Sequence, residues 1–565
     1  MAFQISTIHF LKYISLLLLT IFLASCHSEA SDYYVDAGNG QDHNNGRTPA
    51  AAWKSLDKIN STKFKAGDRI LFKTGEVWHE KLLLASSGTP ENPIILASYG
   101  DGEKPVIAAW DTLFNWSKPT YWTSLKQTVW YIRCPQDPKR IWLSEKEYRC
   151  SKELSGLDST ARWFYDELAH RLYIYSPDIP TKFYTRIAAA AVRDAAGIGR
   201  NVADIIIRDL SFQGGDLYSL HLNNCQRIQI ENCEIGSYSG KYGVLASQSN
   251  YGVIRNCTID SGLRLKYDFE YYAVEDGLKL YSGCNYWKIF DNRIQDWGHS
   301  GIQIQSRDNK LPTSYNEIYQ NTISAKNVAY CRGFEVAGPD GSCQYNKIYR
   351  NYSVDTSVRN QISGDHNSIY YNIVHTLRNV PYRSEGTAQA FSFSNHEGNA
   401  CHHNQLFNNV IYDCDEPAII LRSHEQAPIS DNQIINNIVF ECGGNSKNMA
   451  EGSGLVIEAD EIIFRNVFQN NNFFSFKKSA IIFYRGKEMA VTQFNQQNST
   501  NRDLIGQNLK SDPLFSDATK YNFELKARSP CIDTGQNVQL SVDFEGKPVP
   551  EGKGVDMGAF EFSGK

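Results

Sequence analysis

The stretch NEIYQNTI, which runs from Asn316 to Ile323, returns along the chain in close copies. The copies are NKIYRNYS from Asn346, NSIYYNIV from Asn367, NQLFNNVI from Asn404 and NQIINNIV from Asn432. Each copy alternates apolar and polar residues over a few positions, which is typical of a β-strand. A strand-like unit that recurs every 20 to 40 residues or so, roughly the length of one solenoid repeat, predicts a solenoid of stacked strands.

One position of the repeat holds a cysteine or an asparagine in every copy, including looser copies such as IRNCTI and IFRNVF. These residues are Cys233, Cys257, Asn292, Asn321, Asn351, Asn372, Asn409, Asn437 and Asn466. We expect their side chains to point inward at a tight bend and to bond to the next coil, about 4.8 Å away. The sequence therefore predicts a parallel β-helix whose repeated asparagines are scaffold, so that function lies elsewhere on each coil.

The composition limits the partners of the protein. The chain has 565 residues and a net charge of −5, which argues against a nucleic-acid binder that works by bulk positive charge. Tyrosine and tryptophan are frequent, at 32 and 10 residues. Such side chains suit contacts with carbohydrate, and equally the ordinary packing of β-sheets.

The N-terminus predicts export. Lys12 precedes the run YISLLLLTIFLASC, which is too short for a comfortable membrane span. Its end, LASC, resembles the lipobox of bacterial lipoproteins, and this resemblance implies that Cys26 is lipidated. We therefore expect a signal peptide over residues 1–26, a tether over 27–32 and a lipid anchor in the outer membrane, with the protein facing the periplasm or the surface.

Longer stretches carry a resemblance to a known group of proteins. YYVDAGNGQDHNNGRTPAAAWKSLDKIN from Tyr33, AGDRILFKTGEVWHEKLLL from Ala66 and GTPENPIILASYGDGEKPVI from Gly88 resemble the first part of secreted bacterial β-helix proteins. These proteins are pectate-lyase-like and include polysaccharide lyases and glycoside hydrolases. The resemblance implies an all-β fold, a right-handed parallel β-helix with an N-terminal cap, an inserted β subdomain and a C-terminal capping segment.

We expect three parts after the tether. Residues 33–187 would hold the N-terminal cap, the early coils and an inserted subdomain, in which WFYDELAHRLYIYS from Trp163 predicts a β-hairpin. Residues 188–486 would form the regular β-helix with an active groove, and residues 487–565 the last coils and the C-terminal cap.

A second series of strands, such as GLKLYS, GIQIQS and GFEVAG, lies between the asparagine copies. Alternation places their apolar residues inside and the residues between them outside. One outward column reads His221, Leu245, Lys279, Gln303, Glu335, Gln361, Ser392, Ile420, Val456 and Ile482. The next reads Asn223, Ser247, Tyr281, Gln305, Ala337, Ser394, Arg422, Glu458 and Tyr484. Polar residues gather in the middle coils, which predicts the site there.

The candidate residues are typical of polysaccharide chemistry. The predicted catalytic residues are Lys279, Asp276, Glu335, His299 and Arg332, and the predicted substrate-binding residues are His221, Tyr281, Gln303, Gln305, His396 and Arg422. Each residue alone has a plain structural interpretation, since a single lysine on a strand is usually solvated and an aspartate before a glycine is an ordinary turn residue. Their occurrence on consecutive coils favours a site.

Our first hypothesis is a lyase that cleaves a uronate-containing polysaccharide by β-elimination. A base removes the proton next to the uronate carboxylate, whose charge must be neutralised by calcium or arginine. Lys279 would be the base and Arg332 the counter-charge, while Glu275, Asp276 and Glu335 would hold Ca²⁺. The sequence lacks the aspartate-rich run that marks the calcium site of the best-known pectate lyases.

Two alternatives stay open. A glycoside hydrolase would use Asp276 and Glu335 as paired carboxyls, about 9.6 Å apart along the stack if they lie two coils apart. The segments EDG and GHSG resemble the pattern of polygalacturonases. A surface lipoprotein that binds glycans without catalysis would need neither carboxylate nor lysine. Under each hypothesis we expect a monomer whose partners are a polysaccharide and, through the lipid anchor only, a membrane.

Overall fold

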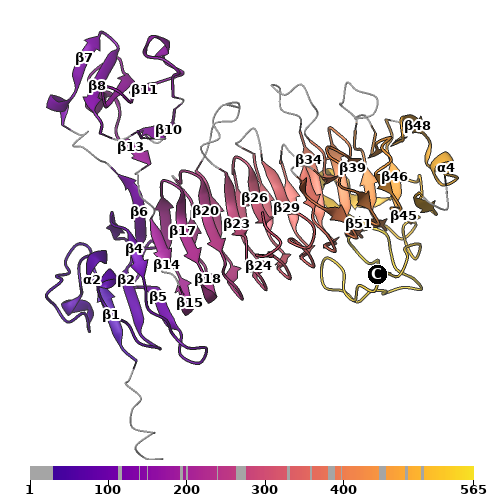
Figure 1. Ribbon diagram of the computed structural model, residues 1–565, viewed down its shortest axis with the longest axis horizontal. Coiled ribbons are helices and arrows are strands. Elements are labelled where there is room, and N and C mark those ends of the chain that lie inside the picture. Colours follow the sequence, from indigo (N-terminus) through magenta and orange to yellow (C-terminus); the bar gives the residue numbers. More distant parts are fainter. Residues whose placement is uncertain are drawn as a thin grey trace, which may run out of the picture.

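The computed structural model is a long stack of β coils (Figure 1). It describes residues 30–564 except 112–117, 136, 139, 145, 149, 191–194, 199–200, 238, 263–274, 327–330, 357–358, 379–387, 396–397, 444–452, 478–480 and 498–501. Three sheets run the length of the stack, and within the described residues they hold 14, 15 and 13 strands. We call them sheets I, II and III in that order. The predicted parallel β-helix is confirmed.

Each regular coil contributes one strand to sheet III, then one to sheet I, then one to sheet II. Sheet III contains β14 (Ala196–Ile198), β17 (Tyr218–Asn223), β20 (Tyr242–Ser247), β23 (Asp276–Tyr281), β26 (Ser300–Gln305), β29 (Arg332–Ala337), β32 (Asn360–Ser363), β35 (Phe391–Ser394), β39 (Ile419–Arg422), β43 (Leu455–Ile457) and β47 (Ile482–Tyr484). Sheet I contains β1 (Asp32–Val35), β2 (Arg69–Lys73), β5 (Ile94–Tyr99), β15 (Ala203–Arg208), β18 (Gln226–Glu231), β21 (Val253–Arg255), β24 (Lys288–Phe290), β27 (Glu317–Tyr319), β30 (Lys347–Tyr349), β33 (Ser368–Tyr370), β37 (Gln405–Phe407), β41 (Gln433–Ile435), β45 (Val467–Gln469) and β49 (Leu504–Gly506). Sheet II includes β16 (Ser211–Gly214), β19 (Glu234–Ile235), β22 (Thr258–Asp260), β25 (Arg293–Gln295), β28 (Thr322–Ser324), β31 (Tyr352–Val354), β34 (Ile373–Leu377), β38 (Val410–Cys414), β42 (Ile438–Phe440) and β46 (Asn472–Phe474).

The repeated asparagines form two ladders, because each copy carries one at both ends of its sheet I strand. Asn321 is typical: its side-chain amide donates to Ile289 O of the preceding coil at 2.9 Å and to Asn351 Oδ1 of the next coil at 3.0 Å. Gln320, just before it, takes φ 54°, which makes the bend tight. The ladder between sheets I and II runs through Cys233, Cys257, Asn292, Asn321, Asn351, Asn372, Asn409, Asn437, Asn471 and Asn508.

The second ladder lies between sheets III and I and runs through Asn316, Asn346, Asn367, Asn404, Asn432 and Asn466. The placement of Asn466 in the first ladder is therefore wrong, and Asn471 takes that place. The reason is that Asn466 and Asn471 repeat the spacing of Asn316 and Asn321, so Asn466 is the first asparagine of its copy and not the second.

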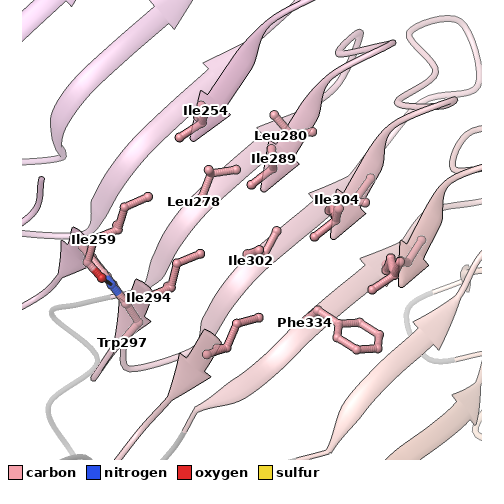
Figure 2. Packing of buried hydrophobic residues seen from close by; sticks show 14 of the residues in the cluster. Ile254, Ile259, Leu278, Leu280, Ile289, Ile294, Trp297, Ile302, Ile304 and Phe334 are labelled. Carbon is pink, nitrogen blue, oxygen red and sulfur yellow. Dashed lines mark hydrogen bonds between the residues drawn. The ribbon is translucent and has the colours of Figure 1, made fainter. Parts of the chain in front are cut away.

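The core is the space enclosed by the three sheets (Figure 2). Leu278 and Leu280 of β23, Ile302 and Ile304 of β26 and Phe334 of β29 point into it, and each is at most 1% exposed. Parallel register stacks each of them on the equivalent residue of the next coil. Full burial of such side chains stabilises the fold by about 1.5–3 kcal/mol each. The inward residues of sheet III therefore fix which residues of that sheet face outward.

Separate elements lie at the ends of the stack. The helix α2 (Leu56–Asn60) buries Leu56 and Ile59 in the same core as the first strands. The helix α4 (Val491–Phe494) places Phe494 against Phe468 and Tyr484 at the other end. Residues after β49 fold back along sheet II, where Phe515, Phe523, Met557 and Phe560 pack with Tyr371, Val410, Ile438 and Phe440.

An antiparallel sheet is inserted near the N-terminal end of the stack (Figure 1). It consists of β7 (Thr123–Lys126), β8 (Val129–Arg133), β11 (Trp163–Asp166) and β12 (Arg171–Tyr175). The strands β11 and β12 form the hairpin that the sequence predicts.

The expected lipidation site, Cys26, lies outside the described residues. In the part of the chain that is described, none of the helices is long and apolar enough to cross a membrane.

Candidate active site

The outward column of sheet III is in the predicted register over most of its length. Lys279 of β23 stands opposite Gln303 of β26, which stands opposite Glu335 of β29, and this residue stands opposite Gln361. The column begins at His221 and continues through Ser392 and Ile420 to Val456.

The predicted outward position of the last residue in each column, Ile482 and Tyr484, is wrong. Ile482 pairs with Leu455 and is fully buried, while Phe483 stands opposite Val456. Tyr484 likewise pairs with the core residue Ile457. The strand AIIFYR has apolar residues at successive positions, so alternation could not fix which of them faces inward.

Five of the predicted site residues form one cluster on the outer face of β23, β26 and β29. We call Asp276, Lys279, His299, Arg332 and Glu335 the polar cluster. His299 lies at its centre: Nδ1 is 2.8 Å from Asp276 Oδ1 and 3.7 Å from Glu335 Oε2. The two carboxylates thus converge on one ring from the coils on either side of it.

A row of glycines at the start of these strands explains this convergence. Gly243, Gly277, Gly301 and Gly333 each lie where a side chain would collide with the interior. A Cβ on Gly277, for example, would lie 2.8 Å from the ring of Trp297 and 2.7 Å from Gly301 O. The residue before each glycine is consequently placed at the outer edge of the strand, and these residues are Tyr242, Asp276, Ser300 and Arg332.

Glu335 is held as a carboxylate. Its Oε2 accepts hydrogen bonds from Arg332 at 2.8 Å, Gln303 at 2.9 Å and Ser300 at 3.0 Å. Burial alone would raise the pKa of Glu335, but Arg332, His299 and these hydrogen bonds outweigh it and lower the pKa to about 2. Glu335 is therefore ionised at neutral pH and cannot donate a proton to a substrate.

The partners of His299 determine where its proton lies. Arg332 contacts His299 Nε2, and a guanidinium can only donate. Nε2 must then accept, so the proton of the neutral ring is on Nδ1 and is donated to Asp276. This assignment follows from the contacts, and it leaves the lone pair of His299 occupied by Arg332.

Lys279 lies beside this network with an aromatic ring on either side. Its Nζ is 3.5 Å from Asp276 Oδ2 and lies 5.3 Å and 5.4 Å from the ring centres of Tyr242 and Tyr281. The carboxylate and the two π faces hold a cation in place. Among the described residues, Asp276 Oδ2, Gln303 Oε1 and Gln305 Oε1 are buried oxygens without a hydrogen-bond partner. They can accept hydrogen bonds from a ligand that displaces water from this face.

The three carboxylates predicted to hold calcium are engaged with other groups. Glu275 binds Lys241 Nζ at 2.8 Å through one oxygen and the Tyr242 hydroxyl through the other. Burial would raise the pKa of Glu275, but these two donors outweigh it and the pKa is lowered. Within the described residues, Glu275, Asp276 and Glu335 do not form a group whose ligand atoms lie within 4.8 Å of one another. Calcium takes about six to eight oxygen ligands, so this arrangement does not fit it, and calcium stays a prediction.

The other predicted binding residues lie along the same sheet or outside the described part. Tyr281, Gln303 and Gln305 adjoin the polar cluster. His221 lies on β17, 3.4 Å from Ser247 Oγ, and Arg422 lies on β39, where it binds Glu458 at 2.6 Å. His396 is not among the described residues.

Sequence reasoning missed Tyr242 and Ser300. Both precede one of the glycines described above, and the alternation rule fails there because the glycine and the apolar residue after it both face the interior. The signal that could have found them is the recurrent pair of a polar residue and a glycine at the start of each strand, in YG, DG, SG and RG.

A family model and the solved structure of XylC agree with this architecture. Residues 197–374 match the family model of the right handed beta helix region. XylC, solved in complex with xylose, has a TM-score of 0.54 at 12% identity, over 94% of this chain and 98% of that chain. The GH136 lacto-N-biosidase from Eubacterium ramulus has a TM-score of 0.40 at 14% identity, over 89% of this chain and 71% of that chain. Pectate lyase Pel9A has a TM-score of 0.35 at 12% identity, over 95% and 98%. No curated protein matches the sequence. The chain is a right-handed parallel β-helix.

Proposed function

We propose that this protein is an enzyme that cleaves a uronate-containing polysaccharide by β-elimination on the outer face of sheet III. The observation that carries the proposal is the position of Lys279, held beside Asp276 between the rings of Tyr242 and Tyr281. XylC shares the fold and was solved with xylose, which supports a carbohydrate as the ligand class.

In the proposed reaction, Lys279 carries the proton. Lys279 acts in its neutral form, whose share grows as the pH rises, and takes the proton from the carbon next to the uronate carboxylate. Arg332, the predicted counter-charge of that carboxylate, binds Glu335 and contacts His299 instead, so a cation that binds together with the substrate would have to neutralise the carboxylate. The electron pair of that C–H bond forms a double bond to the neighbouring carbon, whose bond to the glycosidic oxygen breaks. The leaving oxygen then takes the proton back from the Lys279 ammonium, so the residue is regenerated and no water is consumed.

The remaining residues of the polar cluster position this lysine. Arg332 and Glu335 fix the His299 ring, and His299 fixes Asp276 next to Lys279. The unpartnered oxygens of Gln303 and Gln305 face the same side of the sheet and would accept hydroxyl protons of adjoining sugar rings. Tyr281 offers a ring beside Lys279.

Hydrolysis is the second candidate, because Asp276 and Glu335 converge on the same ring nitrogen. A hydrolase of this kind needs one of the two carboxyls to be protonated so that it can act as the acid. Glu335 has a pKa of about 2 and cannot act as that acid. The role would fall to Asp276, whose Oδ1 already accepts a hydrogen bond from His299, and this favours elimination over hydrolysis.

The test is a panel of acidic and neutral polysaccharides, assayed for the ultraviolet absorbance of unsaturated uronate ends and for new reducing ends. We expect both signals on an acidic glycan. Lys279→Met should lower the elimination rate by about 10²–10⁴-fold, the usual contribution of a proton-transfer group. Lys288→Met, an exposed lysine on β24 of the same coil, is the matched control and should keep full activity.

Three results would contradict the proposal. Reducing ends without ultraviolet absorbance would make the protein a hydrolase, and binding without cleavage of any glycan would make it a binding protein. Full activity of Lys279→Met, with a circular dichroism spectrum like that of the wild type, would remove the proton-transfer role from this residue.

A further inference from the structure

A second group of polar side chains lies outside the polar cluster, at the bend between sheets III and I. Aromatic residues stack along the outside of this bend, one on each coil. They are Tyr251, Tyr286, Tyr315, Tyr345, His366 and His403, with ring centres 4.7–5.2 Å apart. Stacking alone would explain His366 and His403, which end the series.

His402 does not belong to this stack. Its ring is turned by 87° from the rings of both His366 and His403. Its Nδ1 lies 3.0 Å from His403 Nδ1, and its Nε2 lies 2.9 Å from Asp340 Oδ1. Two ring nitrogens at this distance need one donor and one acceptor, so at least one of them presents a lone pair to the other.

The ligand atoms of the three histidines lie close together. One nitrogen from each of His366, His402 and His403 lies within 4.8 Å of the other two. His366 binds Asp365 Oδ2 through Nδ1 at 3.0 Å, which leaves its Nε2 to offer. A histidine oriented by a carboxylate in this way is the usual arrangement of a metal ligand.

The backbone already holds these residues in place. The His366 amide donates to His402 O at 3.2 Å, the His402 amide to Gly364 O at 3.3 Å and the His403 amide to Ser430 O at 3.1 Å. Asp340 follows β29, and Asp365 and His366 follow β32. His402 ends the short strand β36 (Cys401–His402), and His403 follows it. The group therefore joins three successive coils.

We propose that His366, His402 and His403 bind one divalent transition-metal ion, with Zn²⁺ as the best fit, and that water fills the fourth position. Zn²⁺ binds imidazole nitrogen at about 2.0–2.1 Å in a tetrahedron, so its ligand atoms lie roughly 3.3 Å apart. The 3.0 Å between His402 Nδ1 and His403 Nδ1 is close to that spacing. Asp340 binds the other nitrogen of His402, Nε2, and so orients this ring as Asp365 orients His366. Three imidazole ligands select such an ion over Mg²⁺ or Ca²⁺, which prefer oxygen ligands.

The bound ion would link two coils directly at the surface, and the hydrogen bond that His402 donates to Asp340 would join a third. Because the three histidines come together only in the folded chain, binding should raise the unfolding temperature by an amount that grows with the logarithm of the Zn²⁺ excess. Metal binding at this site does not involve the polar cluster, so a negative result here would not affect the proposed reaction.

The experiment uses the exported chain without its signal peptide, freed of metal by dialysis against EDTA. Calorimetric titration with Zn²⁺ should show one saturable site per chain, and Co²⁺ should give the visible absorption of a tetrahedral ion with nitrogen and oxygen ligands. His402→Ala and His403→Ala should each weaken Zn²⁺ binding by at least about tenfold, the scale of effects seen even for outer partners. His170→Ala, an exposed histidine in the inserted sheet, is the control and should bind as the wild type does.

The proposal predicts that the two variants unfold at the wild-type temperature without metal and lose the Zn²⁺-dependent increase. Absence of saturable binding in the wild type would overturn it. Unchanged Zn²⁺ binding in His402→Ala and His403→Ala, or a Co²⁺ spectrum with a thiolate charge-transfer band, would also overturn it, because the ion would then lie elsewhere.

Discussion

Glu335 shows how one residue can be fixed in one protonation state by its neighbours. It lies on the outer face of sheet III, yet it is 6% exposed, and three donors converge on its Oε2. A buried carboxylate is stable only with such compensation. The contacts that lower the pKa of Glu335 also hold the side chains of Arg332 and His299 in position.

The contribution of the Glu335 charge to stability should be visible in the pH dependence of the free energy of unfolding. The pKa of Glu335 is lowered from 4.5 to about 2 in the folded chain. A lowered pKa means that the stabilisation is present above about pH 4.5 and is lost as the pH falls through the folded value near 2. The shift corresponds to about 3 kcal/mol.

We therefore expect Glu335→Gln to lower the free energy of unfolding at pH 7, and the difference from the wild type to shrink between pH 4.5 and 2. Urea denaturation of both proteins at a series of pH values measures this difference. A difference that stays constant down to pH 2 would show that the Glu335 charge does not contribute in this way.

At the scale of the element, the unit is one short strand with an asparagine at each end. Asn351 accepts from the Asn321 amide and donates to Ile318 O at 2.9 Å and to Asn372 Oδ1 at 3.0 Å. Asn351→Ala would leave buried backbone groups unpaired and should cost about 1–3 kcal/mol of stability. Activity per folded molecule should not change.

Thermal and urea unfolding, together with the specific activity, test this prediction. Asn309→Ala, in an exposed turn, serves as the control and should leave the stability unchanged. A stable Asn351→Ala protein that has lost its activity would show that the ladder is not merely scaffold.

The glycines at the start of the sheet III strands are the second element-scale feature. A Cβ on Gly277 would press on Trp297 and on Gly301 O, and the strand would have to move. We expect Gly277→Ala to cost about 1–3 kcal/mol and to reduce activity as well, since Asp276 and Lys279 lie on the same strand on either side of Gly277. Gly506→Ala, which has open space around it, is the control. Unchanged activity in Gly277→Ala would show that the close packing at Gly277 is not needed to position the site.

The sequence predicted the strands and most of the site column because both depend on alternation. The column from His221 to Val456 and the position of Lys279 relative to Gln303 and Glu335 follow from it. Alternation failed at Ile482, because successive apolar residues do not show which of them faces inward. It also failed at Asn466, because either of two asparagines five residues apart could occupy the position in the first ladder. It could not place Tyr242 or Ser300, because the inward position of the following glycine depends on the interior residues that it meets, Trp297 for Gly243 and Ile323 for Gly301.

The contacts of the polar cluster could not be predicted from the sequence. Alternation places Arg332 and Glu335 near each other, but it does not tell whether Arg332 faces a substrate or turns to Glu335 and His299. In the structure it does the latter. The choice depends on burial, since a carboxylate at this depth needs a close cation.

At the scale of the whole molecule, the stack is long and its first strand lies near one end (Figure 1). The strand β1 begins at Asp32, so five residues, 27–31, lie between it and Cys26. A fully extended tether of that length spans at most about 20 Å. Sheet I then passes from β1 through β2, β5, β15, β18 and β21 to β24, which follows β23 on the coil of Lys279, a rise of about 29 Å at 4.8 Å per coil.

We propose that the chain is anchored at the outer membrane through a lipidated Cys26, as its resemblance to a lipobox implies. The anchor would hold the N-terminal end of the stack close to the lipid and leave the polar cluster on the coils beyond it, where it can bind a polymer.

Cys26→Ser removes the acyl chains whose burial supplies the attachment. We expect this variant to move from the membrane fraction to the soluble fraction, and its activity on a dissolved polysaccharide to equal that of the wild type. Cys150→Ser, a partly exposed cysteine in the folded chain, should stay with the membrane. Fractionation followed by immunoblotting distinguishes the two, and a Cys26→Ser protein that remains in the membrane fraction would contradict the anchor.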